Sequence, residues 1–138
     1  MTGSGTTTIV VGYVPTPEGL AAVDYAMNHA REAEGARIVL VNSGSHGRDS
    51  DPKFASPQDL DALAARFDEA GIEHEIRQSA QAFSPAEEIL GAAEEHDADL
   101  IVIGLRRRSP VGKLFLGSSS QQVILDAACP VVAVKRRD

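Results

Sequence analysis

Residues 104–120 combine glycine, arginine and serine in a spacing that suits the binding of a phosphate. An apolar run at residues 100–103 predicts a buried strand that ends at Gly104. Arginines follow at residues 106–108, and Gly117 with three serines then precedes a helical pattern. The free N–H groups and positive dipole end of a helix attract phosphate, and glycine lets its oxygens approach the backbone. The stretch therefore predicts an anion site between a strand end and a helix start.

Motifs of the common nucleotide-dependent enzymes are absent from the sequence. Gly112-Lys113 is followed by Leu114, where a phosphate loop requires Ser or Thr. Neither G-x-G-x-x-G after the first predicted strand nor the nucleophile elbow G-x-S-x-G occurs. The four histidines are scattered, and no pair has metal-ligand spacing. We therefore predict no catalytic residue and no metal-binding residue, although a Ser-His-Asp arrangement formed by the fold stays open.

The composition predicts one globular domain, residues 1–138, with residues 1–6 disordered. A net charge of −7 argues against a nucleic-acid partner, and the absence of Trp argues against a base-stacking platform. The single cysteine, Cys129, excludes an internal disulfide and is expected to be a small buried hydrophobe. No apolar run has the ~20 residues of a membrane helix, and the N-terminus lacks signal-peptide features. The expectation is a cytoplasmic protein without a membrane partner.

Strands and helices alternate along the predicted chain. Apolar or β-branched runs predict strands at residues 7–14, 37–42, 72–78, 100–104 and 131–135. Helices are predicted between them, at residues 18–33, after Ser56, after Ser84 and at residues 118–127. In the first helix, the spacing of Leu20, Val23, Met27 and Ala30 predicts an inward face.

This alternation predicts an α/β fold with a five-stranded parallel sheet and helices on both faces. The first, second and fourth strands are the most apolar and should be central, which favours strand order 3-2-1-4-5. The strand order then reverses between strands one and four, and such sheets bind their ligands at this switch point. The polar loop at residues 43–56 and the stretch 104–120 both start at the carboxyl ends of strands, where the ligand is expected to bind.

The segment GLRRRSPVGKLFLGSSSQQVILDAACPVVAVK, which starts at Gly104, resembles the C-terminal signature of the universal stress protein family. Nucleotide-binding members of that family carry G-x-x-G, nine more residues and then G-[ST], and this chain matches with Gly104 and with Gly117-Ser118. The length, the element order and the long polar loop extend the resemblance over the whole chain.

The resemblance implies a Rossmann-like domain of the adenine nucleotide alpha hydrolase-like type and a regulatory function in the stress response. It also implies that ATP or AMP, with Mg²⁺, binds in the crevice between strands one and four and is hydrolysed slowly if at all. The nucleotide-binding positions that it implies are Gly12, Val14, Ser43, Ile103, Gly104, Arg107, Gly117, Ser118, Ser119 and Ser120.

Two of these positions depart from the family pattern. Val14 stands where the first strand normally ends in an acidic residue, which removes a hydrogen-bond partner for the sugar or base. Arg107 replaces the second motif glycine, so a side chain lies where backbone should meet phosphate, although guanidinium groups can themselves hold phosphate. The alternative hypothesis is a module that binds no nucleotide and acts through its dimer and partner surfaces.

Two further expectations concern relatives and partners. A small hydrolase or an electron-transfer flavoprotein would share the same topology, by analogy of fold alone. The last predicted strand, residues 131–135, is an apolar sheet edge that needs cover. The resemblance implies that a second copy of the chain pairs with this edge across a two-fold axis, giving a homodimer.

Overall fold

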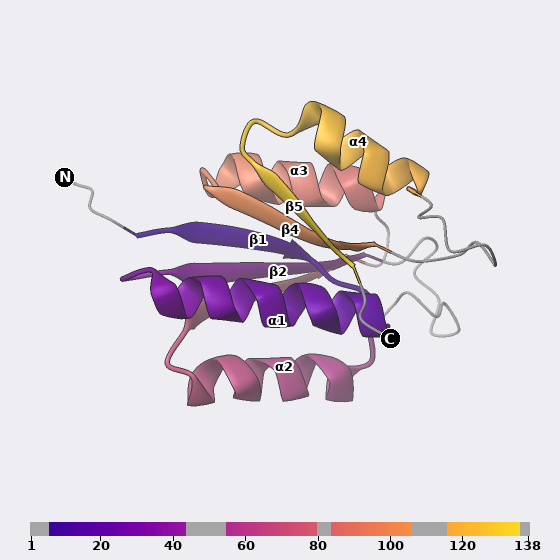
Figure 1. The fold of residues 1–138 in the computed structure, drawn as a ribbon. Coiled ribbons are helices and arrows are strands. Elements are labelled where there is room, and N and C mark those ends of the chain that lie inside the picture. The colour runs from indigo at the N-terminus through magenta and orange to yellow at the C-terminus, as the bar shows by residue number, and fades with distance from the viewer. Residues whose placement is uncertain (1–5, 44–54, 80–83, 106–115, 136–138) are drawn as a thin grey trace.

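A parallel sheet forms the centre of the molecule in the computed structural model, which describes residues 6–43, 55–79, 84–105 and 116–135. Its strands are β1 (Thr8–Gly12), β2 (Arg37–Ser43), β3 (Glu73–Ser79), β4 (Leu100–Leu105) and β5 (Val131–Lys135). They lie in the order β3-β2-β1-β4-β5, and each neighbouring pair is parallel (Figure 1). The predicted topology and strand order are confirmed.

Two helices cover each face of the sheet. Helices α1 (Pro17–Glu32) and α2 (Pro57–Glu69) lie on one face, and α3 (Pro85–Glu95) and α4 (Ser118–Asp126) lie on the other (Figure 1). Each helix starts near the edge where the strands end, because the chain reverses direction between strand and helix. None of the helices in the described ranges is long and apolar enough to cross a membrane.

Hydroxyl side chains cap the first three helices. Thr16, Ser56 and Ser84 each accept a hydrogen bond from the backbone N–H three residues on, at 3.0–3.1 Å. A proline occupies the first turn of each of these helices, where no N–H partner is required. At Ser56 the Asp59 carboxylate also accepts from the cap's own N–H, which completes a capping box. These caps set where α1, α2 and α3 begin.

The hydrophobic core consists of one layer on each side of the sheet. Phe67, Ile9 and Leu40 belong to the layer under α1 and α2, and Val39 and Val123 belong to the layer under α3 and α4. The alternation of side chains along each strand divides neighbouring residues between the two layers. A strand such as β2 is therefore apolar on both faces, as its sequence indicates.

The prediction that Leu20 faces inward is wrong, since this residue is 42% exposed. The other three predicted residues, Val23, Met27 and Ala30, are buried, and the buried stripe also contains the small residues Ala22 and Ala26. Small side chains let the helix axis approach the sheet closely. Cys129 is partly buried beside the α3–α4 layer, and burial raises the pKa of its thiol.

Candidate functional site

Nine of the predicted site residues lie within the described ranges, and they gather where the carboxyl ends of the strands lie. Gly12 ends β1 directly opposite Ile103 of β4, and Ser43 ends β2. The N-terminus of α4 lies on the same edge (Figure 1). Arg107, its neighbours Arg106 and Arg108, and most of the polar loop lie outside the described residues. The topology therefore brings together segments as far apart in the sequence as Gly12 and Ser120.

The two strand glycines have close neighbours inside the fold. A Cβ atom on Gly104 would lie 2.3 Å from the carbonyl oxygen of Glu18 in the first turn of α1. A Cβ atom on Gly12 would lie 2.5 Å from Cδ1 of Ile89 on α3. Both glycines therefore have a packing role whether or not a ligand binds.

The turn after β1 is held tightly against α1. The Val14 carbonyl accepts a hydrogen bond from the Thr16 N–H at 2.8 Å, and Val14 is half-buried. A Cβ atom on Gly19 would lie 1.9 Å from the same Val14 oxygen, so a larger residue would force the turn apart. This close approach at Gly19 was not predicted, since the sequence indicates it only by a glycine in the first turn of a helix.

Ser43 supplies a buried hydroxyl group for which the described part of the chain offers no partner. The residue is 5% exposed, and its Oγ atom makes no hydrogen bond to any described residue. Val41 and Val39, two and four residues earlier on β2, pack in the layer under α3 and α4, so Ser43 faces the same side. Burial of a hydroxyl without a partner costs about 1–3 kcal/mol, which a ligand that bonds to it would recover.

The N-terminus of α4 presents backbone donors that no other described residue accepts from. Its cap residue, Gly117, makes no side-chain cap hydrogen bond, unlike the cap residues of the other three helices. No acceptor among the described residues pairs with the N–H groups of Ser118, Ser119 or Ser120. Gly117 and Ser118 are exposed, and Ser119 and Ser120 are partly buried. These donors and the helix dipole form a surface that favours an anion.

Two polar residues that the sequence analysis did not single out lie behind this edge, namely Asn42 and Tyr13. Asn42 is fully buried and donates to the Tyr13 carbonyl at 2.9 Å. Burial raises the pKa of the Tyr13 phenol, and the nearby Asp59 carboxylate raises it further. In the sequence, the role of Asn42 is indicated by the presence of a polar amide at the end of an otherwise apolar strand.

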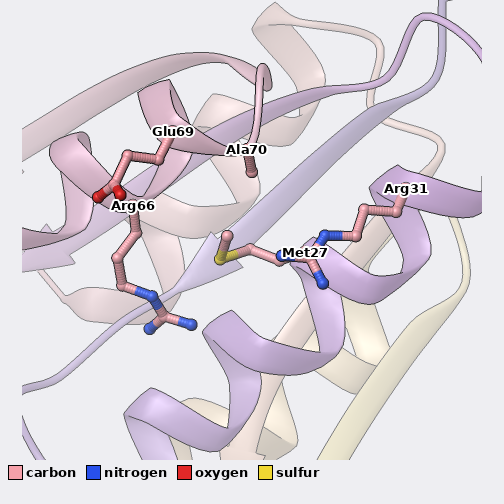
Figure 2. A pocket seen from close by; sticks show the side chains of 5 residues that line it. All are labelled: Met27, Arg31, Arg66, Glu69 and Ala70. Carbon is pink, nitrogen blue, oxygen red and sulfur yellow. The ribbon is translucent and has the colours of Figure 1, made fainter.

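A shallow groove of about 250 Å³ lies away from the predicted site, between α1 and α2 (Figure 2). It is lined by Met27, Arg31, Arg66, Glu69 and Ala70, which belong to the C-terminal halves of the two helices or directly follow α2. Arg66 is already paired with Asp24 at 2.7 Å. The groove therefore lies toward the amino ends of the strands, away from Ser43 and Gly117.

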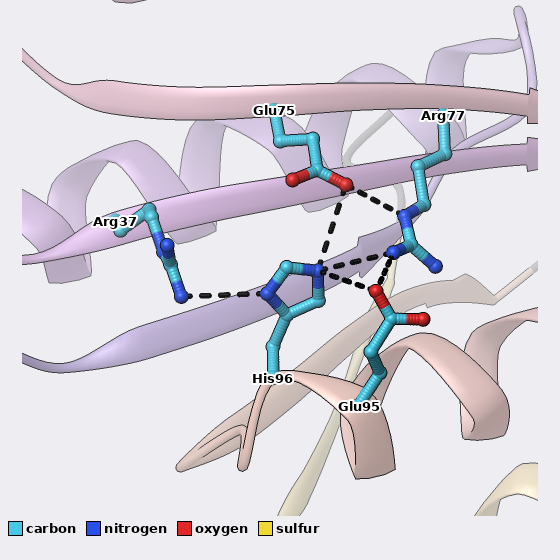
Figure 3. Close-up of polar contacts among 5 residues, drawn as sticks. All are labelled: Arg37, Glu75, Arg77, Glu95 and His96. Carbon is cyan, nitrogen blue, oxygen red and sulfur yellow. Dashed lines mark hydrogen bonds and ion pairs between the residues drawn. The ribbon is translucent and has the colours of Figure 1, made fainter.

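A charged cluster ties the C-terminus of α3 to β2 and β3 (Figure 3). Arg77 donates to Glu75 at 2.6 Å and also pairs with Glu95, and His96 lies between Arg37 and Glu75. The Arg77 hydrogen bond holds the pKa of the Glu75 carboxyl below its usual range. In the described ranges, no group of three or more His, Cys, Asp or Glu residues could hold a metal ion.

Comparison with known proteins identifies one family over most of the chain. The model of the universal stress protein family matches residues 5–135. A universal stress protein of Mycolicibacterium smegmatis is 39% identical over 127 residues, which cover 92% of this chain and 96% of the relative.

Solved structures of universal stress proteins share the same fold. One from Archaeoglobus fulgidus superposes with a TM-score of 0.75 at 30% identity, covering 94% of this chain and 98% of that one. A structure from the same organism in complex with dAMP has a TM-score of 0.70 at 25% identity, with the same coverage of 94% and 98%.

Proposed function

Because the chain belongs to the universal stress protein family, we propose that it is a regulatory protein that binds an adenine nucleotide. The proposed site lies between the carboxyl ends of β1 and β4, with ATP or AMP as the ligand. It comprises Gly12, Val14, Ser43, Ile103, Gly104, Arg107, Gly117, Ser118, Ser119 and Ser120. The complex of an Archaeoglobus fulgidus relative with dAMP supports this choice of ligand class.

The observation that carries the proposal is the uncapped N-terminus of α4. The N–H groups of Ser118, Ser119 and Ser120 have no acceptor among the described residues, and the cap residue Gly117 makes no side-chain cap hydrogen bond. A nucleotide phosphate supplies oxygen acceptors and negative charge, which the helix terminus favours. The three other helices already have their first-turn donors capped by Thr16, Ser56 or Ser84.

Ser43 supports the nucleoside half of the proposed site. Its hydroxyl is the one buried side-chain oxygen in the described ranges that has no hydrogen-bond partner. An adenine edge offers both a donor and an acceptor to such a group. Because Val14 replaces a carboxylate, this chain has fewer polar groups for the nucleoside, and Ser43 is correspondingly more important.

Mg²⁺ enters the proposal only together with the phosphates. None of the proposed site residues carries a carboxylate, so the protein offers the ion no side chain of the type that Mg²⁺ prefers. We propose that the ion accompanies ATP through its phosphate oxygens. Binding of AMP should then be independent of Mg²⁺.

Calorimetric titration of the purified protein with AMP, ATP and ATP·Mg²⁺ tests the proposal, with thermal unfolding as a second readout. Ligand at a hundred times its Kd should add about 2.7 kcal/mol to the free energy of unfolding.

Replacement of the Ser43 hydroxyl in Ser43→Ala should weaken nucleotide binding about fivefold. Ser79→Ala is the matched control, because Ser79 pairs with Ser43 in register on the neighbouring strand. Absence of both heat and stabilisation with all three ligands would refute nucleotide binding and favour the module that acts through protein surfaces.

We also propose that two copies of the chain pair through β5. This strand lies at the edge of the sheet, and its residues 131–134 are apolar and only partly buried in the single chain. On the adjacent α4, Leu125 is 79% exposed and Ile124 is also exposed. A second copy would cover apolar surface that a monomer leaves in water.

A further inference from the structure

Two side-chain amides, a fully buried one on β2 and an exposed one on β3, join the three strand ends next to the proposed nucleotide site. Asn42 donates through Nδ2 to the Tyr13 carbonyl and accepts through Oδ1 from the Ala55 N–H, both at 2.9 Å. Gln78, opposite Asn42 on β3, donates to the same Oδ1 at 2.9 Å and to the Ala55 carbonyl at 2.8 Å. We call Asn42 and Gln78 the amide clamp.

The orientation of the Asn42 side chain follows from its partners. The Tyr13 carbonyl can only accept a hydrogen bond, and the Ala55 N–H can only donate one. If the Asn42 side-chain oxygen and nitrogen were exchanged, its oxygen would face the Tyr13 oxygen and its NH₂ group would face the Ala55 N–H. An apolar residue in place of Asn42 would take this partner from the buried Tyr13 carbonyl and the buried Ala55 N–H, and a buried polar group left unpaired costs about 1–3 kcal/mol. The strand end is therefore locked in one position.

The clamp is adjacent in sequence to two residues of the proposed site. Tyr13 precedes Val14, and Asn42 precedes Ser43. Leu40 belongs to the layer under α1 and α2, so alternation places Asn42 on that face and Ser43 on the other. A rotation of the β2 end that released Asn42 would also displace the Ser43 hydroxyl.

We infer that the amide clamp positions Ser43 and thereby determines which nucleotide base the site accepts. This inference rests on the proposed function. A buried hydroxyl held in one place discriminates strongly, because a base edge that cannot pair with it leaves a buried polar group unsatisfied. A mobile hydroxyl can adapt to either edge, so loss of the clamp reduces selectivity as well as affinity. Asn42 and Gln78 are positioning residues under this inference, and neither need touch the ligand.

The ratio of the affinities for AMP and GMP tests the inference, because a loss of stability alone would weaken both ligands equally. In Asn42→Ala and Gln78→Ala, binding of AMP should weaken by up to about fivefold, the effect expected for loss of the Ser43 hydroxyl itself, and the AMP-to-GMP preference should fall by a similar factor. Amide hydrogen exchange at Ala55 should also accelerate in Asn42→Ala, with or without nucleotide. Val39→Ala is the control, since it destabilises the buried core of the same strand away from the site and should keep the ratio within about twofold.

Gln78→Ala decides the outcome if Asn42→Ala does not fold, because Gln78 is exposed and its loss leaves the core intact. An unchanged ratio in variants that still bind AMP would overturn the inference and leave the proposed function standing. A wild-type protein that binds neither nucleotide would overturn the proposed function and the inference together.

Discussion

At the scale of single residues, Gly104 gives the clearest prediction, because the backbone of α1 lies against it. Its Cβ position is 2.3 Å from the Glu18 carbonyl oxygen and 2.7 Å from the carbonyl carbon, neither of which can rotate away. Gly104→Ala should force α1 away from β4 and lower the free energy of unfolding by about 1–3 kcal/mol. Urea denaturation of the protein without nucleotide measures this effect.

Gly91→Ala is the matched control for this prediction. Gly91 lies inside α3, and no atom is within 4 Å of its Cβ position. Alanine there should stabilise the protein by about 0.5–1 kcal/mol through the lower entropy of its unfolded chain. If both variants shifted the midpoint in the same direction, the close approach of Glu18 to Gly104 would be contradicted.

The sequence predicts some site residues and cannot predict others, for a physical reason. Gly104 and Gly117 are recognisable because their spacing lies within one continuous stretch. Asn42 is different, since its partners Tyr13, Ala55 and Gln78 are 29, 13 and 36 residues away. Its role depends on strand register, which the sequence analysis did not assign.

At the scale of the elements, the charged cluster at the C-terminus of α3 predicts a pH dependence of stability. The Arg77 hydrogen bond lowers the pKa of Glu75 below its ordinary 4.5 in the folded protein. Stability from this carboxylate is therefore present above the unfolded pKa and is lost as the pH falls through the folded pKa. Because the Glu75 side chain is 43% exposed, solvent screening limits the contribution to less than about 1 kcal/mol. Glu75→Gln should lower stability at pH 7 and flatten its decline below pH 4.5.

Urea midpoints from pH 7 down to pH 3 measure this effect. Glu73→Gln is the control, because Glu73 begins the same strand and is exposed to solvent. Removal of its charge should leave the shape of the wild-type curve unchanged. Parallel curves for the wild type and Glu75→Gln would show that Arg77 does not hold this carboxylate.

Element order and strand order could be predicted because they depend on patterns that many residues share. Continuous apolar runs in β1, β2 and β4 indicate central strands, and the more polar β3 indicates an edge. The face of α1 was mispredicted at Leu20, because apolar spacing alone does not show that alanines form the contact. Helix rotation is decided by the sheet on which the helix packs.

At the scale of the whole molecule, the backbone groups on the free edge of β5 predict how the proposed dimer can be disrupted. The Ile101 N–H donates to the Pro130 carbonyl at 3.0 Å. In a parallel pair, alternate residues of a strand bond to the same neighbour, so Val132 and Val134 bond to β4. The N–H of Ala133 therefore points away from the sheet, toward a partner strand.

Ala133→Pro should convert the dimer to a monomer or an aggregate, while the pairing of β5 with β4 survives. Proline removes only the outward N–H at this position, which sheet edges tolerate. Val134→Pro is the contrasting variant, because it removes an N–H bonded to β4 and should also lower the melting temperature. Light scattering gives the mass, and thermal unfolding separates the two variants. A dimer that persists in Ala133→Pro with unchanged mass would place the interface elsewhere, with the exposed Leu125 face of α4 as the next surface to test.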